Sequence, residues 1–428
     1  MKSQYLPRLF DETLKFSLKS KGAVVIVGPK WCGKSTTALR HAKSVIDLMP
    51  ISKRAEWIAL AKISPEEFLS RGEHPLLIDE WQHVYFLWDQ IKYEVDRLGG
   101  FGHYILTGSV TADFERQDDG FRHTGNGRIV KKRMRTLSLF ESKESNGKVS
   151  LSDLKEGKFA PCTSSMGIPD YAFALCRGGW PMAIAQEKDV ALSQAKDYFE
   201  MLVREDIFSF KGIPLRKDEQ RARRFMRSYA RNVSIPAADE TLREDCSSVD
   251  GSFDKDTFQK YLSALRCLYV VEELPAWNPN LRSKTAIRSK PTRHFVDPSI
   301  ATSALGITPK SLFDDITTFG LLFESLAIRD LRIYAESIGA RVYKYRDAKS
   351  READAVVCFP DGGFALIEVK LGDEEEIALA SKKLCAIAND IDQEKTGRHC
   401  FSMVITKNQV ARRDENGTYI VPLGCLKN

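Results

Sequence analysis

The sequence contains one stretch whose residue types and spacing are those of a phosphate-binding loop. Residues 28–35 read GPKWCGKS and follow an apolar, β-branched run at 23–27, so they fit the pattern G-x-x-x-x-G-K-[ST] after a buried strand. Backbone N–H groups of such a loop, and the positive end of a helix expected to begin at about Lys34, would hold phosphate groups. Lys34 would reach the β- and γ-phosphates as a catalytic residue, and Ser35 would ligate Mg²⁺. The stretch therefore predicts binding of a purine triphosphate such as ATP.

The residues expected to contact the nucleotide lie in this loop and at the start of the following helix. Gly28 and Gly33 allow backbone angles and a close approach that a Cβ atom would obstruct. The alternative is a chance glycine-rich turn, but the sequence predicts both the strand before the loop and the helix after it. The predicted contacts are Gly28, Pro29, Lys30, Trp31, Cys32, Gly33, Lys34, Ser35 and Thr36.

A second stretch supplies carboxylates for the same site. Residues 74–82 read HPLLIDEWQ, with a short apolar run that ends in Asp79 and Glu80. Ligands of open α/β sheets sit at the carboxyl ends of the parallel strands. We therefore expect Asp79 to hold the Mg²⁺ shell and Glu80, as a catalytic residue, to orient or activate the attacking water. The alternative is a strand that ends at a solvent-exposed turn.

A third predicted strand, within residues 103–109 (HYILTGS), ends in small polar residues. Thr107 or Ser109 would hydrogen-bond the attacking water or the γ-phosphate, and an ordinary turn is the alternative. The next segment, residues 111–135, is predicted to be an arginine-rich loop. One arginine, for which we take Arg128, would complete the ATP site within the chain or from a neighbouring subunit of a homo-oligomer; otherwise the arginines form a surface cluster. The candidate arginines are Arg122, Arg128, Arg133 and Arg135.

The C-terminal part of the sequence predicts a second group of charged side chains on adjacent strands. A helix is expected over 319–337, followed by strands at 341–345, 352–357 and 364–370. Glu368 and Lys370 are two residues apart on a strand, so they face the same side. Asp354 and Glu368 would share Mg²⁺, with Glu324 as an additional ligand, and Lys370 would stabilise the attacking hydroxide or the phosphorane. The alternative is a structural hairpin with an exposed Glu/Lys pair.

The middle of the chain is predicted to be mainly helical, with a long helix over 189–208. Residues 216–231 carry seven basic and two acidic residues, which suits either a solvated helix face or contact with the DNA backbone. Residues 252–271 predict a helix that runs into a strand, as in the second half of a winged-helix-like unit. Such units bind DNA or serve only as packing modules, so DNA is one of two alternatives here.

Composition limits the class of protein. The chain has 428 residues, of which 43% are hydrophobic and 29% charged, and its net charge is +6. No apolar run approaches the length of a membrane span, and the first residues lack the apolar core of a secretory leader. The nine cysteines form no C-x-x-C pair, so neither a disulfide framework nor a cysteine metal site is indicated. We expect a cytoplasmic protein without membrane contact.

The length of the chain predicts two or three domains. The polar segment 144–167 is the first predicted boundary, and short local patterns predict helices over 4–20 and 35–48 and a strand at 57–60. We expect an α/β protein with three parts: a P-loop NTPase domain with a parallel sheet at 1–145, a helical and winged-helix-like domain at 168–300, and a restriction-endonuclease-like α/β domain at 301–428.

Taken together, these motifs resemble a family of prokaryotic AAA-type ATP-binding proteins with an uncharacterised C-terminal domain. The resemblance runs over nearly the whole chain and implies an AAA-like ATPase, a helical and winged-helix middle and a nuclease-like C-terminal domain. Ala353 and Ser35 replace the family's commoner Val and Thr, which leaves Asp354 and the Mg²⁺-binding hydroxyl in place. The segments that carry the resemblance are 5–8, 28–35, 77–82, 106–109, 127–128, 137–141, 178–181, 204–207, 323–324, 352–354 and 367–370.

Three functions are consistent with these observations. The first is an AAA-type ATPase that hydrolyses ATP with Mg²⁺. The second is an ATP-gated DNA nuclease with the C-terminal carboxylates and Lys370 as its centre. The third is a non-enzymatic switch, in which ATP alters binding to a protein or nucleic-acid partner and the nuclease-like fold is catalytically silent.

Overall fold

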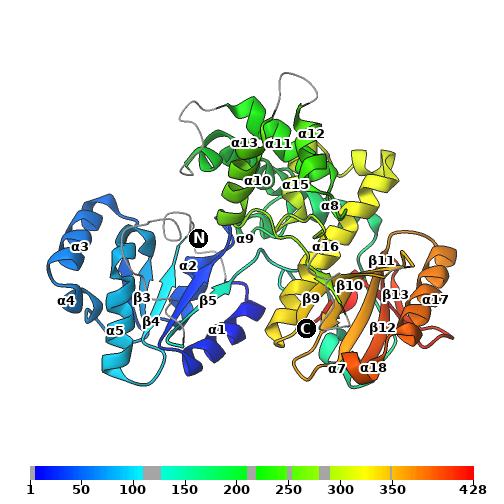
Figure 1. Cartoon of the computed structure of the whole chain (residues 1–428), viewed down its shortest axis with the longest axis horizontal. Helices are drawn as coiled ribbons and strands as arrows, with labels where there is room; N and C mark the ends of the chain where they lie inside the picture. Colours follow the sequence, from blue (N-terminus) through cyan, green and yellow to red (C-terminus); the bar gives the residue numbers. More distant parts are fainter. Residues whose placement is uncertain (1–4, 109–126, 210–217, 248–252, 279–289, 348) are drawn as a thin grey trace. The chain divides into compact units, whose positions relative to one another are not determined.

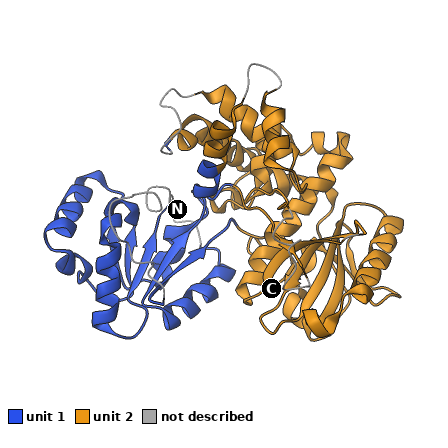
Figure 2. Ribbon diagram, in the orientation of Figure 1, with its two compact units in different colours: residues 1–136, 209–212, 263–270 blue, residues 137–208, 213–262, 271–428 orange. Residues whose placement is uncertain are grey.

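The computed structural model describes residues 5–108, 127–209, 218–247, 253–278, 290–347 and 349–428 (Figure 1). The chain separates into two compact units, which are drawn in different colours in Figure 2. Unit 1 comprises residues 1–136, 209–212 and 263–270, and unit 2 comprises residues 137–208, 213–262 and 271–428. No helix among the described residues is long and apolar enough to cross a membrane.

Unit 1 is built on a five-stranded parallel sheet with the strand order β2-β3-β4-β1-β5. The strands are β1 (Ala23–Val27), β2 (Ser44–Asp47), β3 (Leu76–Asp79), β4 (Tyr104–Thr107) and β5 (Ile129–Arg133). The three strands that precede the polar motifs, β1, β3 and β4, are neighbours in this order. Because the carboxyl ends of parallel strands lie at one edge, the sheet brings the three motifs together.

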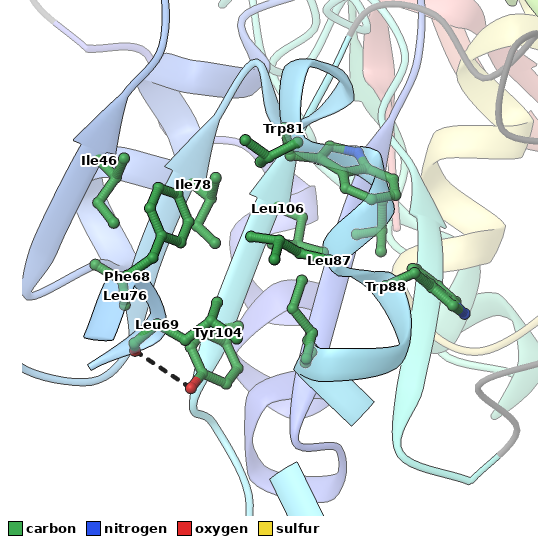
Figure 3. Close-up of a cluster of buried hydrophobic side chains, with 14 of the residues drawn as sticks. Ile46, Phe68, Leu69, Leu76, Ile78, Trp81, Leu87, Trp88, Tyr104 and Leu106 are labelled. Carbon is green, nitrogen blue, oxygen red and sulfur yellow. Dashed lines mark hydrogen bonds between the residues drawn. The ribbon is translucent and has the colours of Figure 1, made fainter. Parts of the chain in front are cut away.

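Helices cover both faces of the unit 1 sheet (Figure 1). Alternate residues of β1 belong to two separate cores, as the period of a strand requires: Val24 and Ile26 to one, Val25 to the other. Figure 3 shows the larger core, in which the Tyr104 hydroxyl donates a 3.3 Å hydrogen bond to the Leu69 carbonyl. The helices are α1 (Leu9–Ser20), α2 (Lys34–His41), α3 (Ile51–Ile63), α4 (Pro65–Leu69) and α5 (Trp88–Leu98), with a 3₁₀ segment at Trp81–Leu87.

Three elements of unit 1 differ from the prediction. The helix after the loop ends at His41 rather than near residue 48, because the following residues pair with β3 as the edge strand β2. The strand predicted at 57–60 is wrong, since these residues lie inside α3 and pack against the larger core. The arginine-rich segment predicted as a loop contains β5, which pairs with β1. In each case pairing or packing with a distant segment overrides the local sequence signal.

The first half of unit 2 is mainly helical. The helix predicted over 189–208 is present as α10 followed by a π-helical turn at Leu202–Asp206 and a 3₁₀ turn at Ile207–Ser209. An aromatic cluster joins α11 to α13: the Phe225 ring centroid lies 5.2 Å from that of Phe258 and 5.6 Å from that of Tyr261. The helices are α8 (Ile168–Arg177), α9 (Pro181–Ile184), α10 (Lys188–Met201), α11 (Glu219–Arg231), α12 (Asp239–Ser247), α13 (Lys255–Cys267), α15 (Pro298–Leu305) and α16 (Ile316–Ser337).

The second half of unit 2 is organised on an eight-stranded sheet with the order β7-β13-β14-β12-β11-β10-β9-β8. In Figure 1, α16 lies on one side of this sheet, against β9 to β11, and α17 (Glu374–Asp390) lies on the other side, against β11 and β12. The strands are β7 (Cys162–Thr163), β8 (Ala276–Trp277), β9 (Arg341–Arg346), β10 (Glu352–Cys358), β11 (Phe364–Lys370), β12 (His399–Thr406), β13 (Val410–Arg413) and β14 (Tyr419–Pro422).

The segment 144–167, which we predicted to be a domain boundary, is an integral part of unit 2. It contains β6 (Val149–Ser150), α7 (Leu151–Lys155) and β7. β6 pairs with β15 (Leu426–Lys427), and β7 pairs with β13. The prediction was wrong because backbone pairing with the far end of the sequence, which composition does not reveal, holds this polar segment in place. The domain predicted at 301–428 falls in unit 2. The domain predicted at 168–300 also falls there, except for residues 209–212 and 263–270, which belong to unit 1.

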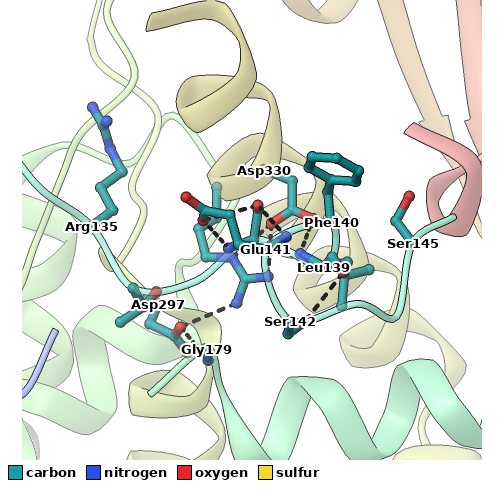
Figure 4. A network of polar contacts seen from close by, with 12 residues as sticks. Arg135, Leu139, Phe140, Glu141, Ser142, Ser145, Gly179, Asp297 and Asp330 are labelled. Atoms are coloured by element: carbon teal, nitrogen blue, oxygen red, sulfur yellow. Dashed lines mark hydrogen bonds and ion pairs between the residues drawn. The ribbon is translucent and has the colours of Figure 1, made fainter. Parts of the chain in front are cut away.

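A network of buried charge holds distant segments of unit 2 together (Figure 4). The Arg329 guanidinium lies 3.1 Å from Asp297 and 2.7 Å from Asp330, and these three residues are at most 3% exposed. Asp297 also accepts a hydrogen bond from the Gly179 N–H, and Asp330 accepts one from the Leu139 N–H. The motifs at 137–141 and 178–181 are therefore anchored to α15 and α16.

Replacing Arg329 with methionine is expected to destabilise unit 2 by about 3–5 kcal/mol, because two buried carboxylates lose their cation. Arg71→Met is the matched control: Arg71 and Glu67 are 53% and 50% exposed, so the loss of this surface pair should cost at most about 1 kcal/mol. Urea unfolding followed by circular dichroism measures both changes. Equal midpoints for Arg329→Met and the wild-type chain would show that the network does not stabilise unit 2.

His294 is expected to make the stability of unit 2 depend on pH. The ring is buried, with Nδ1 3.3 Å from the Ser325 hydroxyl, and burial, together with Arg332 and Lys344, lowers its pKa well below the ordinary value. A histidine that stays neutral when folded contributes fully above about pH 6.5, and its contribution is lost as the pH falls below that value. His294→Gln should reduce this loss, by up to about 1.4 kcal/mol per pH unit. Urea midpoints are measured for both chains from above pH 6.5 to below it. Equal losses of stability in the wild-type and His294→Gln chains would contradict the role given to His294.

Candidate functional site

The phosphate-binding loop of unit 1 joins β1 to α2 through backbone angles that favour glycine. Gly28 has φ +153°, and Gly33, directly before α2, has φ +97°. A Cβ atom on Gly28 would lie 2.1 Å from the Met134 carbonyl oxygen, so both the backbone angle and the available space require glycine there. α2 begins at Lys34, as predicted, and its first N–H groups have no partner within the helix and face the loop.

The Lys34 ammonium group lies against the loop. Its Nζ donates hydrogen bonds to the carbonyl oxygens of Gly28 at 3.0 Å and Pro29 at 2.8 Å, and the residue is 7% exposed. An ammonium group has three N–H donors, so one donor is left for a phosphate oxygen. The loop thus carries a positive charge beside the amino end of α2.

Three oxygens meet at the carboxyl ends of β3 and β4, as the motif spacing predicts. The Ser35 hydroxyl donates a 2.8 Å hydrogen bond to Asp79 Oδ1, and the Thr107 hydroxyl donates to the same atom. Asp79 is 8% exposed, and both of these donors are neutral. Hydroxyl and carboxylate oxygens are the ligands that Mg²⁺ prefers. The residues present therefore fit a magnesium ion held by Ser35 and Asp79.

Glu80, the predicted catalytic carboxylate, follows directly after β3 in a left-handed backbone conformation with φ +56°. The Gln82 side-chain amide donates a hydrogen bond to Glu80 Oε2. A Cβ atom on Gly108 would lie 2.5 Å from Gln82 Oε1, so the glycine after β4 leaves space for this amide. Sequence reasoning gave Gln82 no role, because the contact depends on the turn after β3 rather than on a motif.

The segment before α1 contributes two contacts that the motif analysis did not predict. The Arg8 guanidinium donates to the carbonyl oxygens of Cys32 at 2.9 Å and Thr136 at 3.1 Å, which ties the phosphate-binding loop to the end of unit 1. The Tyr5 hydroxyl lies 3.2 Å from the Thr37 hydroxyl of α2. The only sequence signal was the motif at 5–8, which supported the resemblance but suggested no role for its residues.

The structure places Arg128 away from the predicted nucleotide contacts. Its carbonyl oxygen pairs with the N–H of Ala23, at the amino end of β1, and its side chain pairs with Asp96 in a contact that leaves both 46% exposed. The loop follows the opposite, carboxyl end of β1. Arg128 therefore does not complete this site from within the chain, which corrects that prediction. Ser109 and Arg122 lie outside the described residues.

The predicted C-terminal residues gather on α16, β10 and β11 of unit 2, but they are engaged with lysines. Asp354 Oδ1 lies 3.0 Å from Lys344 Nζ, and Glu368 Oε1 lies 3.0 Å from Lys370 Nζ. Burial raises the pKa of Asp354, but Lys344 and Lys370 outweigh this effect and lower it below the usual range. Burial and the Asp354 carboxylate raise the pKa of Glu324 to about 8.

The surroundings of these C-terminal residues bear on the metal site predicted for them. Nowhere in the described ranges do three or more His, Cys, Asp or Glu side chains stand in positions that could hold a metal ion together. The prediction that Asp354 and Glu368 share Mg²⁺, with Glu324 as an additional ligand, therefore stays a prediction. The lysine partners weigh against it, because ammonium groups neutralise the carboxylates that a metal would need.

Gly28→Ala is expected to weaken ATP binding roughly 5- to 150-fold, because relieving the clash with Met134 must shift the loop, and local backbone strain of this kind costs about 1–3 kcal/mol. Gly99→Ala is the matched control: Gly99 also has positive φ, at +64°, but has no other atom within 4 Å of an added Cβ. Titration with a fluorescent ATP analogue measures both. The loop geometry would be contradicted if the two variants bound equally well.

Two solved structures show partial similarity to this chain. The Walker-type ATPase PABY2304 of Pyrococcus abyssi is 15% identical, and the match covers 71% of this chain and 97% of that one, with a TM-score of 0.44. The ORC2 protein of Aeropyrum pernix, in ADPNP–ADP complexes, is 11% identical over 72% of this chain and 98% of that one, with a TM-score of 0.22. Both TM-scores are too low to support a statement about fold or function. No curated protein matches the chain.

Family models match three consecutive parts of the chain. Residues 168–311 and 319–426 match two models that are each described as a domain of unknown function (DUF8612 and DUF4143). Residues 20–143 match a model described as an AAA domain. These residues include the phosphate-binding loop and all five strands of the unit 1 sheet. Unit 1 is therefore a P-loop domain of the AAA ATPase type.

Proposed function

We propose that unit 1 binds ATP together with Mg²⁺ and hydrolyses it to ADP and phosphate. The observation that carries this proposal is the convergence of Ser35, Asp79 and Thr107 at the edge of the sheet from which the phosphate-binding loop emerges. Magnesium, when bound, neutralises the β- and γ-phosphates and so makes the γ-phosphorus open to attack.

The residues of the site have separate tasks in this proposal. Lys34 directs its remaining N–H donor and its positive charge at the β- and γ-phosphate oxygens, while Ser35 and Asp79 would hold the metal ion. Glu80 orients the attacking water and accepts its proton as the water oxygen bonds to the γ-phosphorus and the bond to ADP breaks. Gln82 supports Glu80 by its hydrogen bond to the carboxylate, which keeps the base from rotating into solvent.

Substitution of two residues separates binding from hydrolysis. Glu80→Gln should lower ATP turnover by at least about a hundredfold, because the base is lost, and should leave ATP binding intact. Lys34→Ala should weaken binding itself, since it removes the cation held at the loop. The control is Asp96→Asn, an exposed carboxylate whose partner is Arg128. A steady-state phosphate-release assay and a nucleotide titration measure the two effects, and unchanged turnover in Glu80→Gln would refute the assignment of the base.

We also propose a finer description of the fold of unit 2. In support of a winged-helix-like part, α11, α12 and α13 are followed by isolated strand pairings of Val271 with Phe295 and Leu274 with Thr292. In support of a restriction-endonuclease-like part, α16 is followed by the antiparallel strands β9, β10 and β11 and then by α17 and the parallel strand β12. This order places Asp354 and Glu368 on neighbouring strands.

For unit 2 we favour the role of a partner-binding switch over that of a DNA nuclease. On the basic helix α11, the Arg223 guanidinium binds both oxygens of Glu200, at 2.8 and 2.5 Å, so this arginine serves packing within the unit. The C-terminal carboxylates are likewise paired with lysines. ATP turnover in unit 1 would then alter how unit 2 holds a protein or nucleic-acid partner.

A further inference from the structure

One lysine lies among the C-terminal carboxylates, and the motif analysis did not include it. Lys344 is on β9, and its side chain is 10% exposed. Its Nζ atom is 3.0 Å from Asp354 Oδ1, 3.6 Å from Glu324 Oε1 and 3.9 Å from Glu352 Oε2. Three carboxylates therefore surround one ammonium group.

A divalent metal ion would compete with this ammonium group for the same oxygen. Mg²⁺ takes oxygen ligands at about 2.0–2.1 Å, so a metal on Asp354 Oδ1 would lie close to Nζ. Two cations at such a distance repel each other strongly inside a protein, where the effective dielectric constant is far below that of water. Lys344 already donates a hydrogen bond to Asp354 Oδ1. The ammonium group thus supplies the positive charge that a metal would otherwise supply.

Some of the other carboxylate oxygens in this cluster have partners, and two have none. Asp354 Oδ2 accepts a 2.9 Å hydrogen bond from the Val369 N–H. Glu368 Oε1 lies 3.0 Å from Lys370 Nζ and 2.5 Å from Lys383 Nζ. Within the described part of the chain, Glu324 Oε1 and Glu368 Oε2 are buried without a hydrogen-bond partner. These two oxygens, together with Asp354 Oδ1, are the acceptors that would be left for a metal if Lys344 were removed.

We propose that Lys344 is an internal cation that replaces the divalent metal of a nuclease-like centre, so that the native chain excludes metal from Asp354. The C-terminal centre is then a metal-free cluster of carboxylates. Removal of the ammonium group converts it into a site for a divalent cation. This inference rests on the nuclease-like fold proposed for unit 2, and it is independent of ATP hydrolysis in unit 1.

The test measures binding of Mn²⁺, from the loss of its free electron paramagnetic resonance signal, to the full chain without nucleotide. All chains carry Asp79→Asn, which removes the carboxylate of the unit 1 site. We expect this background to bind no Mn²⁺ and the added Lys344→Met to gain one Mn²⁺ per chain. Adding Asp354→Asn should abolish the gain. The matched control is Lys349→Met, which removes a 72% exposed lysine paired with Asp390 and should gain nothing.

Two results would overturn the proposal directly. One is Mn²⁺ binding by the background chain that Asp354→Asn abolishes, because a metal would then bind beside Lys344. The other is a folded Lys344→Met chain that binds no Mn²⁺. ATP turnover is not measured, so failure of the proposed hydrolysis cannot produce either result.

A second variant covers the case in which Lys344→Met does not fold, since its buried carboxylates lose their cation. Lys344→Gln is neutral but keeps an amide that can donate to Asp354, and both variants are refolded with and without Mn²⁺. Folding that requires Mn²⁺ supports the proposal, because the metal then replaces the ammonium group. Failure of both variants to fold in either condition would show that a metal cannot take the place of Lys344, and would overturn it.

Discussion

The ion cluster of Arg329 with Asp297 and Asp330 fixes the helix on which much of unit 2 depends. All three side chains are buried, so removing any one of them leaves an uncompensated charge in the low-dielectric interior. The same cluster binds the backbone of the motifs at 137–141 and 178–181. Because α16 is one continuous helix of 22 residues, the clamp at its middle also sets the position of Glu324, earlier on the helix. The packing of the motifs at 137–141 and 178–181 and the position of Glu324 in the C-terminal centre thus both depend on α16.

The two candidate sites differ in how their carboxylates are compensated. In unit 1, Asp79 accepts hydrogen bonds from neutral hydroxyl groups, so its negative charge is still available to attract a cation. In unit 2, Asp354 and Glu368 lie beside ammonium groups, and their charge is already balanced. Oxygen ligands alone do not define a metal site. The charge of the neighbouring groups determines whether the binding of a metal ion is favourable.

The unit 1 site was largely predictable because its functional residues lie in short segments directly after buried strands. Apolar runs predict the strands, and the parallel sheet then brings Ser35, Asp79 and Thr107 to one edge. The supporting contacts were not predictable: the Gln82 contact depends on the conformation of the turn after β3, and the Lys344 contacts depend on the pairing of β9 with β10. Short strands such as β2 and β6 were missed for the same reason, since they exist only through pairing with remote segments. The C-terminal carboxylates and Lys370 were located correctly, but Lys344 and Lys383 were not foreseen as their partners.

Unit 1 is not one continuous stretch of chain. Residues 263–270 belong to it; Tyr269 packs against the larger core, and the Arg133 guanidinium lies 5.1 Å from its ring centroid. Most of unit 2's helical half, residues 137–208 and 213–262, must be synthesised before this piece is available. Closing a loop of that length has an entropic cost. The core of unit 1 lacks Tyr269 until residues 263–270 have been synthesised, so it cannot be completed when residues 1–136 alone are available. Completion of the unit 1 core therefore depends on the prior synthesis of most of the helical half of unit 2.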